Sequence, residues 1–305
     1  ATIQHAFDQL EKEGFLVSRG KFGSYVSKAP PHLSKFGLVQ CLPNCWGVTS
    51  LYRRNIDHVA KKITRGGDFE LSIYEPLMPQ SSSNDYVELL KDISSHCIAG
   101  IIFAGEPLPA WKDSIMAGAL PKAVIGSQPH FYKDLPCVKV ETSSFFDLAL
   151  RDLAEHSRRR PALIMVDDDI ARHAGRFRRL SEEAGLQTRP YWEQGVSWTS
   201  RINVVGLVRL MFNPGQKQRP DSIIVADDNL LEGVVQGLVE SGVSVPDEVR
   251  LVCLVNRPIL PDVAVEYTAL GVSMEDVIGK ALDMLVAIRQ GRKIQMSEKI
   301  DISGS

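Results

Sequence analysis

From residue 36 onward, short apolar runs alternate with stretches of helical periodicity, and this rhythm constrains the fold more than any other feature. Strands are expected at the apolar runs 37–42, 70–74, 98–103, 122–125, 137–140, 162–166, 222–225 and 251–255. Helices are expected between them at 50–64, 85–95, 144–156, 170–184, 200–212, 229–241 and 275–289. Strands that are apolar on both faces predict parallel sheets covered on both sides. So many strands exceed one sheet of about six, which predicts two Rossmann-like α/β subdomains.

The chain of 305 residues suits about two domains. A formal net charge of −2 excludes a uniformly basic nucleic-acid coat, although it allows a local basic patch. Five cysteines are odd in number and scattered, which indicates reduced thiols in a cytoplasmic protein. The longest apolar stretches, such as 97–105, are far shorter than a membrane span, and the sequence opens without a signal pattern. We therefore expect no membrane partner.

The first 28 residues have a different character. They predict one amphipathic helix that ends at Gly14, followed by two short strands around a turn at 20–23. The apolar positions of the helix are Ile3, Ala6, Phe7 and Leu10. A helix and a hairpin this short bury too little surface to fold alone, so either they pack on the rest of the chain or their partner helices are missing. The paired prolines Pro30 and Pro31 predict a stiff linker over 29–35.

The ends of the strands are where open parallel sheets bind ligands. Asp167–Asp169 and Asp227-Asp228 follow two predicted strands, and such carboxylates could hold Mg²⁺ in a metal-dependent transferase. They could equally cap the helices that follow. The sequence has no phosphate-binding glycine loop, no zinc-protease motif and no nucleophile elbow, and no general base accompanies the aspartates. We therefore expect no enzyme, no cofactor and no metal.

Two further groups of side chains could bind a ligand or could have only a structural role. His5 and the Arg19–Lys21 tip could contact nucleic acid, although basic residues on a hairpin tip are most often only solvated. Trp46 and Trp198 lie in polar loop contexts. Each indole could stack on the flat face of a sugar or base, or could cover the end of a helix.

The first segment resembles the second half of a GntR-type winged helix-turn-helix. The matching stretches are ATIQHAFDQLEKEG at 1–14 and SRGKFGSYV at 18–26, which correspond to the recognition helix and the wing hairpin. The resemblance covers only these two elements, so we expect a partial winged-helix domain over 1–28. It implies double-stranded operator DNA as a partner. The residues that it places on DNA are Thr2, Gln4, His5, Arg19, Gly20 and Lys21.

Residues 36–305 resemble the effector domain of LacI/GalR-type repressors, which has the periplasmic binding protein-like type I fold. The matching segments include IAGII at 98–102, RPDSII at 219–224, ADD at 226–228 and GVSVPDEV at 242–249. The resemblance implies an N-subdomain at about 36–141 and 268–292. It implies a C-subdomain at about 142–267 and 293–305.

The same resemblance implies an effector site in the cleft between the subdomains. Its residues would be Trp46, Glu141, His173, Trp198, Asp227, Asn229 and Asn256. The family often has Arg where His173 stands and Gly where Arg176 stands. The family often has an Asp that binds sugar hydroxyls after the strand at 251–255; Val255 stands at that position here, with Asn256 adjacent. The family's Asp after the strand at 137–140 is replaced by Glu141.

Together the resemblances predict a DNA-binding transcriptional repressor that acts as a homodimer and responds to a sugar or sugar derivative. Two alternatives remain at this point. One is a solute-binding protein without a role on DNA, and the other is the metal-dependent transferase named above.

Overall fold

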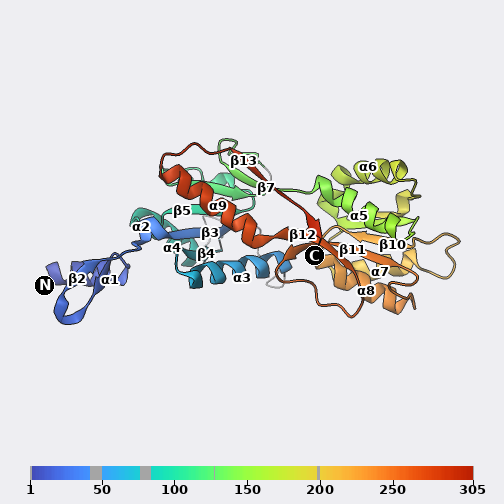
Figure 1. Ribbon diagram of the computed structural model, residues 1–305, viewed down its shortest axis with the longest axis horizontal. Coiled ribbons are helices and arrows are strands. Elements are labelled where there is room, and N and C mark those ends of the chain that lie inside the picture. Colours follow the sequence, from blue (N-terminus) through green and yellow to red (C-terminus); the bar gives the residue numbers. More distant parts are fainter. Residues whose placement is uncertain (1, 42–49, 76–83, 127, 198–199, 305) are drawn as a thin grey trace. The chain divides into compact units, whose positions relative to one another are not determined.

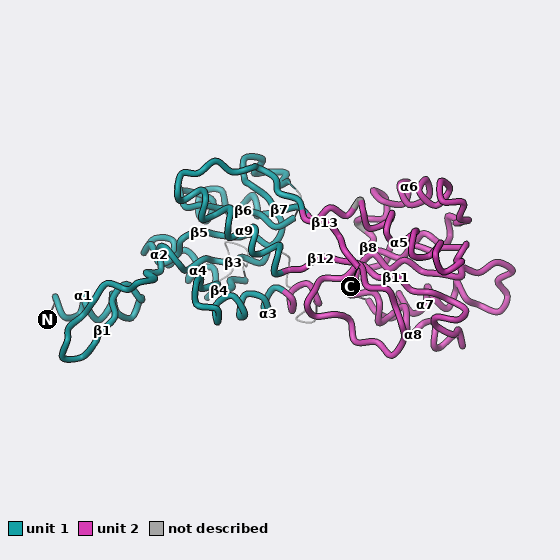
Figure 2. The backbone as a smooth tube through the Cα atoms, viewed as in Figure 1, with its two compact units in different colours: residues 1–43, 56–139, 275–299 teal, residues 44–55, 140–274, 300–305 magenta. Residues whose placement is uncertain are grey.

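The computed structural model describes residues 2–41, 50–75, 84–126, 128–197 and 200–304, and the chain divides into two compact units (Figure 2). Unit 1 comprises residues 1–43, 56–139 and 275–299, and unit 2 comprises 44–55, 140–274 and 300–305. The chain changes unit at, among other points, 139/140, 274/275 and 299/300. Each unit is therefore built from stretches that are distant in sequence.

The sheet of unit 1 has six strands in the order β13-β7-β6-β5-β3-β4. The pairs between β7 and β4 are all parallel, and Leu38 in β3, the strand next to the edge strand β4, lies between Ile73 and Ile102. The bounds are β3 Lys35–Gln40, β4 Glu70–Tyr74, β5 Gly100–Ala104, β6 Lys122–Ile125, β7 Cys137–Glu141 and β13 Ser297–Asp301. Three of these strands, β3, β5 and β6, have almost wholly buried side chains, as the continuous apolar runs predict.

Helices α3 (Leu51–Gly66), α4 (Asn84–Ser94) and α9 (Met274–Arg289) accompany this sheet, with a 3₁₀ turn at Pro109–Trp111 (Figure 1). The first five residues of α3 belong to unit 2. Gly100 shows why a side chain is missing at the start of β5. A Cβ there would lie 3.2 Å from Leu285 Cδ1 of α9 and 3.1 Å from the carbonyl oxygen of Pro121. Glycine thus allows α9 to pack closely on the strand.

The helix–hairpin segment (residues 2–28) also belongs to unit 1. It contains α1 (Thr2–Lys12) and an antiparallel hairpin of β1 (Leu16–Ser18) and β2 (Ser24–Val26) around a 3₁₀ turn at Gly20–Phe22. Gly14 follows α1 with a φ of +83°, a conformation that favours glycine after a helix. The helix, its glycine stop and the hairpin are as the sequence predicts. The apolar side of α1 stays open to solvent, since Ile3 is 77% exposed.

The sheet of unit 2 has the order β14-β12-β11-β10-β8-β9. Its strands are parallel except for the β12/β14 pair. The bounds are β8 Pro161–Val166, β9 Glu193–Val196, β10 Ser222–Val225, β11 Arg250–Arg257, β12 Thr268–Ser273 and β14 Ser303–Gly304. The core beside this sheet includes Trp192, Val234 and Leu251, all at least 98% buried.

Four helices cover the sheet of unit 2, and Figure 1 shows α5 and α6 on one side and α7 and α8 on the other. They are α5 Ser143–Glu155, α6 Asp167–Glu183, α7 Arg201–Met211 and α8 Leu231–Glu240, and 3₁₀ turns lie at Pro190–Trp192 and Asp228–Leu230. Two glycines bring α7 and α8 together. A Cβ at Gly233 would lie 2.9 Å from Val204 Cβ, and one at Gly237 would lie 2.6 Å from Val208 Cβ. The helix pair can therefore pack only with glycine at both positions.

The α/β fold with two parallel-dominated sheets is confirmed, and all seven predicted helices between residues 36 and 305 are present within a few residues of the predicted ends. Three segments differ from the predicted subdomain boundaries. The described residues 50–55 were expected in the N-subdomain and lie in unit 2. Residues 268–273 form β12, which pairs with β11 and so lies in unit 2. Residues 293–299 lie in unit 1, where the backbone N–H of Cys137 donates to the carbonyl oxygen of Met296 at 3.0 Å.

The cysteines Cys41, Cys97, Cys137 and Cys253 are free and buried. Cys45 lies outside the described residues. Burial raises the pKa of the Cys41 and Cys253 thiols well above the usual range, and nearby carboxylates add to this. These two thiols are accordingly packed as small apolar side chains and are poor nucleophiles.

Candidate functional site

The carboxyl ends of β8, β10 and β11 meet at one edge of the unit 2 sheet, because these strands are parallel and in register. Three polar segments lie there. Asp167 begins α6 directly after β8, the turn Asp227–Asn229 follows β10, and Asn256 is the penultimate residue of β11. The sequence thus places its acidic and amide residues at the edge where such sheets bind ligands.

Asp227 and Asn229 form a hydrogen-bonded pair. The Asp227 Oδ1 atom accepts from the backbone N–H of Asn229 and from its Nδ2 group, both at 2.9 Å. Asp227 thereby caps the 3₁₀ turn, as an aspartate before a helical turn is expected to do. The Asn229 Oδ1 atom accepts from the backbone N–H of Leu51 at 2.8 Å. The two residues predicted to face the effector are therefore brought together, each half-buried.

Asp228 points the other way and is only 2% exposed. Its Oδ2 atom accepts from the backbone N–H of Asn256 at 2.9 Å and from Asn256 Nδ2 at 3.1 Å. Its Oδ1 atom is buried without a hydrogen-bond partner among the described residues. The side-chain amide of Asn256, predicted to contact the effector, is thus engaged by a buried carboxyl group that the sequence suggested only as a metal ligand or a helix cap.

Burial shifts the proton equilibria of both aspartates. Desolvation raises the pKa of Asp228 to about 7, and the neighbouring Asp227 charge adds to the rise, against hydrogen bonds from Asn256 and Asn229. Desolvation also raises the pKa of Asp227, and Asp169 contributes in the same direction. The pair therefore holds less than two full negative charges near neutral pH.

Asn55 completes this edge, and its side chain is fully buried. Its Nδ2 group donates to the carbonyl oxygens of Leu51, Asn256 and Ile259 at 2.9, 3.0 and 2.9 Å. Its Oδ1 atom accepts from the backbone N–H of Ile259 at 2.7 Å. One amide thus fixes the backbone after β11 to the first turn of α3. We call Asn55, Asp227, Asp228, Asn229 and Asn256 the carboxyl-edge cluster.

Four of the predicted effector residues lie elsewhere or outside the described residues. His173 is on α6, half-buried, and its ring centroid lies 6.1 Å from that of Phe146. Glu141 is the last residue of β7 and is half-buried. Trp46 and Trp198 lie outside the described residues. The ring contact of His173 is therefore made with Phe146 of α5. Of the predicted set, the carboxyl-edge cluster contains Asp227, Asn229 and Asn256.

The predicted DNA contacts lie on α1 and on the hairpin tip. Thr2 begins α1, and Gln4 Nε2 donates to Asp8 Oδ1 at 2.8 Å. The tip residues are exposed. The Arg19 guanidinium lies 5.1 Å from the Tyr25 ring centroid, and the Lys21 ammonium lies 5.5 Å from that of Phe22. Gly20 between them has a φ of +57°, so the turn uses the freedom of glycine.

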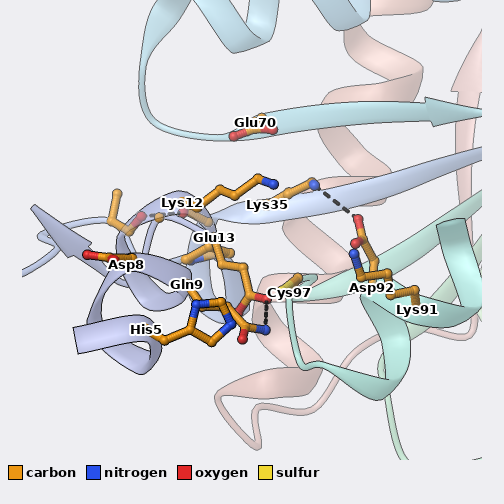
Figure 3. Close-up of a pocket in the computed structure, with 14 residues that line it drawn as sticks. His5, Asp8, Gln9, Lys12, Glu13, Lys35, Glu70, Lys91, Asp92 and Cys97 are labelled. Carbon is orange, nitrogen blue, oxygen red and sulfur yellow. Dashed lines mark hydrogen bonds and ion pairs between the residues drawn. The ribbon is translucent and has the colours of Figure 1, made fainter. Parts of the chain in front are cut away.

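His5 also lines a cavity of about 590 Å³ between α1 and the rest of unit 1 (Figure 3). Gln9 and Lys12 line its α1 side, and Lys35 and Asp92 lie on the opposite side. Lys35 Nζ and Asp92 Oδ2 are 3.0 Å apart, and the Tyr74 hydroxyl donates to the same oxygen at 2.6 Å. The cavity is open to solvent, since His5, Gln9 and Lys12 are all exposed, so this side of α1 stays accessible.

Asp167 and Asp169 lie in the first turn of α6, directly after β8. Within the described ranges, no group of three or more His, Cys, Asp or Glu residues could hold a metal ion. Asp169 forms an ion pair with Arg172 at 3.3 Å, and Asp167 starts α6 on its exposed side. None of the helices in the described part of the chain is both long and apolar enough to cross a membrane.

Comparisons with known proteins agree with this architecture. A family of periplasmic binding protein-like domains matches residues 150–304. The arabinose metabolism transcriptional repressor of Geobacillus stearothermophilus is 22% identical over 310 residues, which cover 96% of this chain and 82% of that protein. A LacI-family regulatory protein from Chloroflexus aggregans superposes with a TM-score of 0.69 at 14% identity, over 88% of this chain and 96% of that one. A LacI-family transcriptional regulator from Mycobacterium smegmatis gives 0.62 at 15% identity, over 88% and 96%.

Proposed function

The chain belongs to the family of periplasmic binding protein-like domains, and we propose that it is a transcriptional repressor whose affinity for operator DNA is controlled by a sugar. One observation carries the proposal. The similarity to the arabinose repressor extends over 96% of the chain, which leaves about 12 residues outside it, so it covers both units and includes at least half of the helix–hairpin segment. A solute-binding protein without a role on DNA would not need a helix and a hairpin that bind DNA. The protein acts by binding rather than by catalysis, requires no cofactor, and works in the cytoplasm where its DNA lies.

In this proposal the helix–hairpin segment is part of a GntR-type winged helix. Thr2, Gln4 and His5 on α1 would face the major groove. Arg19, Gly20 and Lys21 form the exposed tip of the wing, where two cations can reach phosphate oxygens. The glycine between them lets the backbone approach the phosphates without a side chain in the way.

The sugar in this proposal binds at the carboxyl edge of unit 2. Asp227 and Asn229 offer carboxylate and amide oxygens that accept hydrogen bonds from hydroxyl groups, and Asn256 follows on the next strand. Glu141 and His173 are proposed as further polar contacts. Trp46 and Trp198 are proposed as the aromatic rings that stack on the sugar.

Control follows if the sugar prefers one conformation of the protein over another. Only such a difference in affinity can change the population that binds DNA. A coupling of about 1–3 kcal/mol, or about 5–150-fold in affinity, would be typical. In a homodimer, two helix–hairpin segments would read two half-sites, so a change in their separation would alter the fit to the operator.

Two measurements test the proposal. Selection from a random duplex library should enrich a defined sequence, and its affinity should fall steeply with salt concentration as phosphate contacts require. L-Arabinose, other pentoses and hexoses should then be added to that complex, and one of them should change the affinity at least several-fold. A chain that shows no salt-dependent binding to any duplex but still binds a sugar would be a solute-binding protein, and the proposal would be wrong.

A further inference from the structure

The connection between the helix–hairpin segment and the sheet of unit 1 is ordered. Pro30 and Pro31 are both buried, and α2 (Pro31–Ser34) forms one helical turn. The backbone N–H of Leu33 donates to the carbonyl oxygen of Pro30 at 2.9 Å, and the Ser34 hydroxyl donates to the same oxygen at 3.0 Å. Strand β3 begins at Lys35 with no residue between. A structured turn therefore joins the two parts, in place of a flexible tether.

One contact holds the helix–hairpin segment on α2. The ring of Phe15 stacks on the ring of His32, with centroids 5.6 Å apart and an interplanar angle of 16°. Gly14 also lies close to α2, since a Cβ at Gly14 would be 3.4 Å from the Pro31 ring. The end of α1 and the start of the hairpin are thus seated on α2.

A different contact holds α2 on the body of unit 1. Arg289 Nη1 donates to the carbonyl oxygen of Leu33 at 2.6 Å. The last carbonyl groups of a helix have no partner within it, so an external donor is needed. A guanidinium is a strong donor for this purpose because its hydrogen bond is assisted by charge. Arg289 is half-buried and is the last residue of α9.

Helix α9 connects the boundary between the two units in the chain with α2, because its first residue lies at that boundary and its last residue binds Leu33. It begins at Met274, beside the point where the chain passes from unit 2 into unit 1. Its Leu285 is fully buried and packs at Gly100 on the start of β5. An arginine in the last turn of a helix also stabilises that helix through its dipole. The hydrogen bond to Leu33, however, joins α9 to α2, the helical turn that precedes β3 and on which the helix–hairpin segment packs.

We propose that Arg289 is a positioning residue that fixes the helix–hairpin segment on unit 1 through α2. The guanidinium holds the end of α2, His32 of α2 holds Phe15, and the DNA contacts follow the orientation of that assembly. The link to sugar control rests on the function proposed above. The fixing of the segment itself does not, because it can be measured without DNA and without a sugar.

The test uses a fluorophore on the hairpin. Ser24 of β2 is exposed, so Ser24→Cys in a Cys45→Ser background gives a labelling site while the other four cysteines are buried. Time-resolved anisotropy of the label should show the slow tumbling of the whole chain. In the Arg289→Ala and the His32→Ala variants, most of this slow component should be lost and replaced by fast local motion.

Two matched variants serve as controls. Arg289→Lys can still donate to the Leu33 carbonyl and should keep the slow component. Arg292→Ala removes an exposed guanidinium three residues further on and should leave the decay unchanged. His32 is exposed, so its removal tests the same assembly if Arg289→Ala lowers the unfolding temperature. A full slow component in either Arg289→Ala or His32→Ala would overturn the proposal.

A second readout separates this proposal from the repressor function. On the duplex selected by the wild-type chain, Arg289→Ala should lose the change in DNA affinity caused by the active sugar, while the sugar still raises the unfolding temperature. An unchanged response in Arg289→Ala would also overturn the positioning role. If the wild-type chain binds no duplex, the repressor function fails, and the anisotropy decay alone decides the role of Arg289.

Discussion

Replacing the buried carboxyl group of Asp228 by an amide should change how stability depends on pH. A carboxyl group has a pKa of about 3.9 in an unfolded chain, whereas burial raises the pKa of Asp228 to about 7. The folded state therefore binds the proton more tightly than the unfolded state. Its contribution to stability is complete below the unfolded pKa and is lost as the pH rises through the folded pKa.

The size of the effect follows from these two values. Between pH 5 and pH 6 the unfolded carboxyl group is ionised while the folded one still holds most of its proton. Stability then falls by about 1.4 kcal/mol per pH unit, and the slope is about half of this at pH 7, where the folded group is half ionised. Asp228→Asn cannot ionise, so it should lose this dependence. Its free energy of unfolding relative to wild type should rise by about 2.5 kcal/mol from pH 5 to pH 8.

Urea denaturation at pH 5, 6, 7 and 8 measures this difference directly. A constant offset between Asp228→Asn and wild type is allowed, because the new amide changes the hydrogen bonds at Asn256 equally at every pH. Asp247→Asn removes an exposed carboxylate from the same unit and should show no comparable trend. A difference between Asp228→Asn and wild type that stays constant from pH 5 to pH 8 would refute the reasoning.

Three further changes have defined outcomes. Asn55→Ala removes four hydrogen bonds of a fully buried amide and should lower the free energy of unfolding by about 3 kcal/mol in urea. Gly237→Ala would place a Cβ 2.6 Å from Val208 Cβ and should cost about 1–3 kcal/mol, whereas Gly206→Ala in α7 meets nothing within 4 Å and should gain up to about 1 kcal/mol. Equal unfolding midpoints for the two glycine variants would contradict the close approach of α7 and α8. Lys21→Ala should weaken DNA binding for all sequences and reduce the salt slope by about 1, which a salt titration of the complex measures; an unchanged slope would remove the wing tip from the DNA contacts.

The alternating pattern of the sequence was sufficient to predict the α/β class, the helices and the central strands, because those elements are defined by continuous apolar runs and helical spacing. Four strands were missed for identifiable reasons. Strands β9 and β13 contain polar or charged residues throughout most of their length and lie at sheet edges, where burial on both faces is not required. Strand β12 contains Gly271, and β14 has two residues.

The polar site was predictable only in part. Asp227 and Asn229 follow a strand that the sequence marks clearly, so their position at the sheet edge could be expected. The inward direction of Asp228 depends on the 3₁₀ turn that Asp227 caps, and this turn is too short to leave a periodic signal. The role of Asn55 depends on bonds to Asn256 and Ile259, about 200 residues away, which no local pattern records.

The division of each unit into separate stretches has a consequence for how the protein is made. Unit 1 needs β13, and β13 begins at Ser297, whereas β3 of the same sheet begins at Lys35. A ribosome must therefore deliver some 260 residues after the first strand before that sheet can close. Neither unit can be completed early during synthesis, so a nascent chain exposes an unfinished sheet edge for most of its translation.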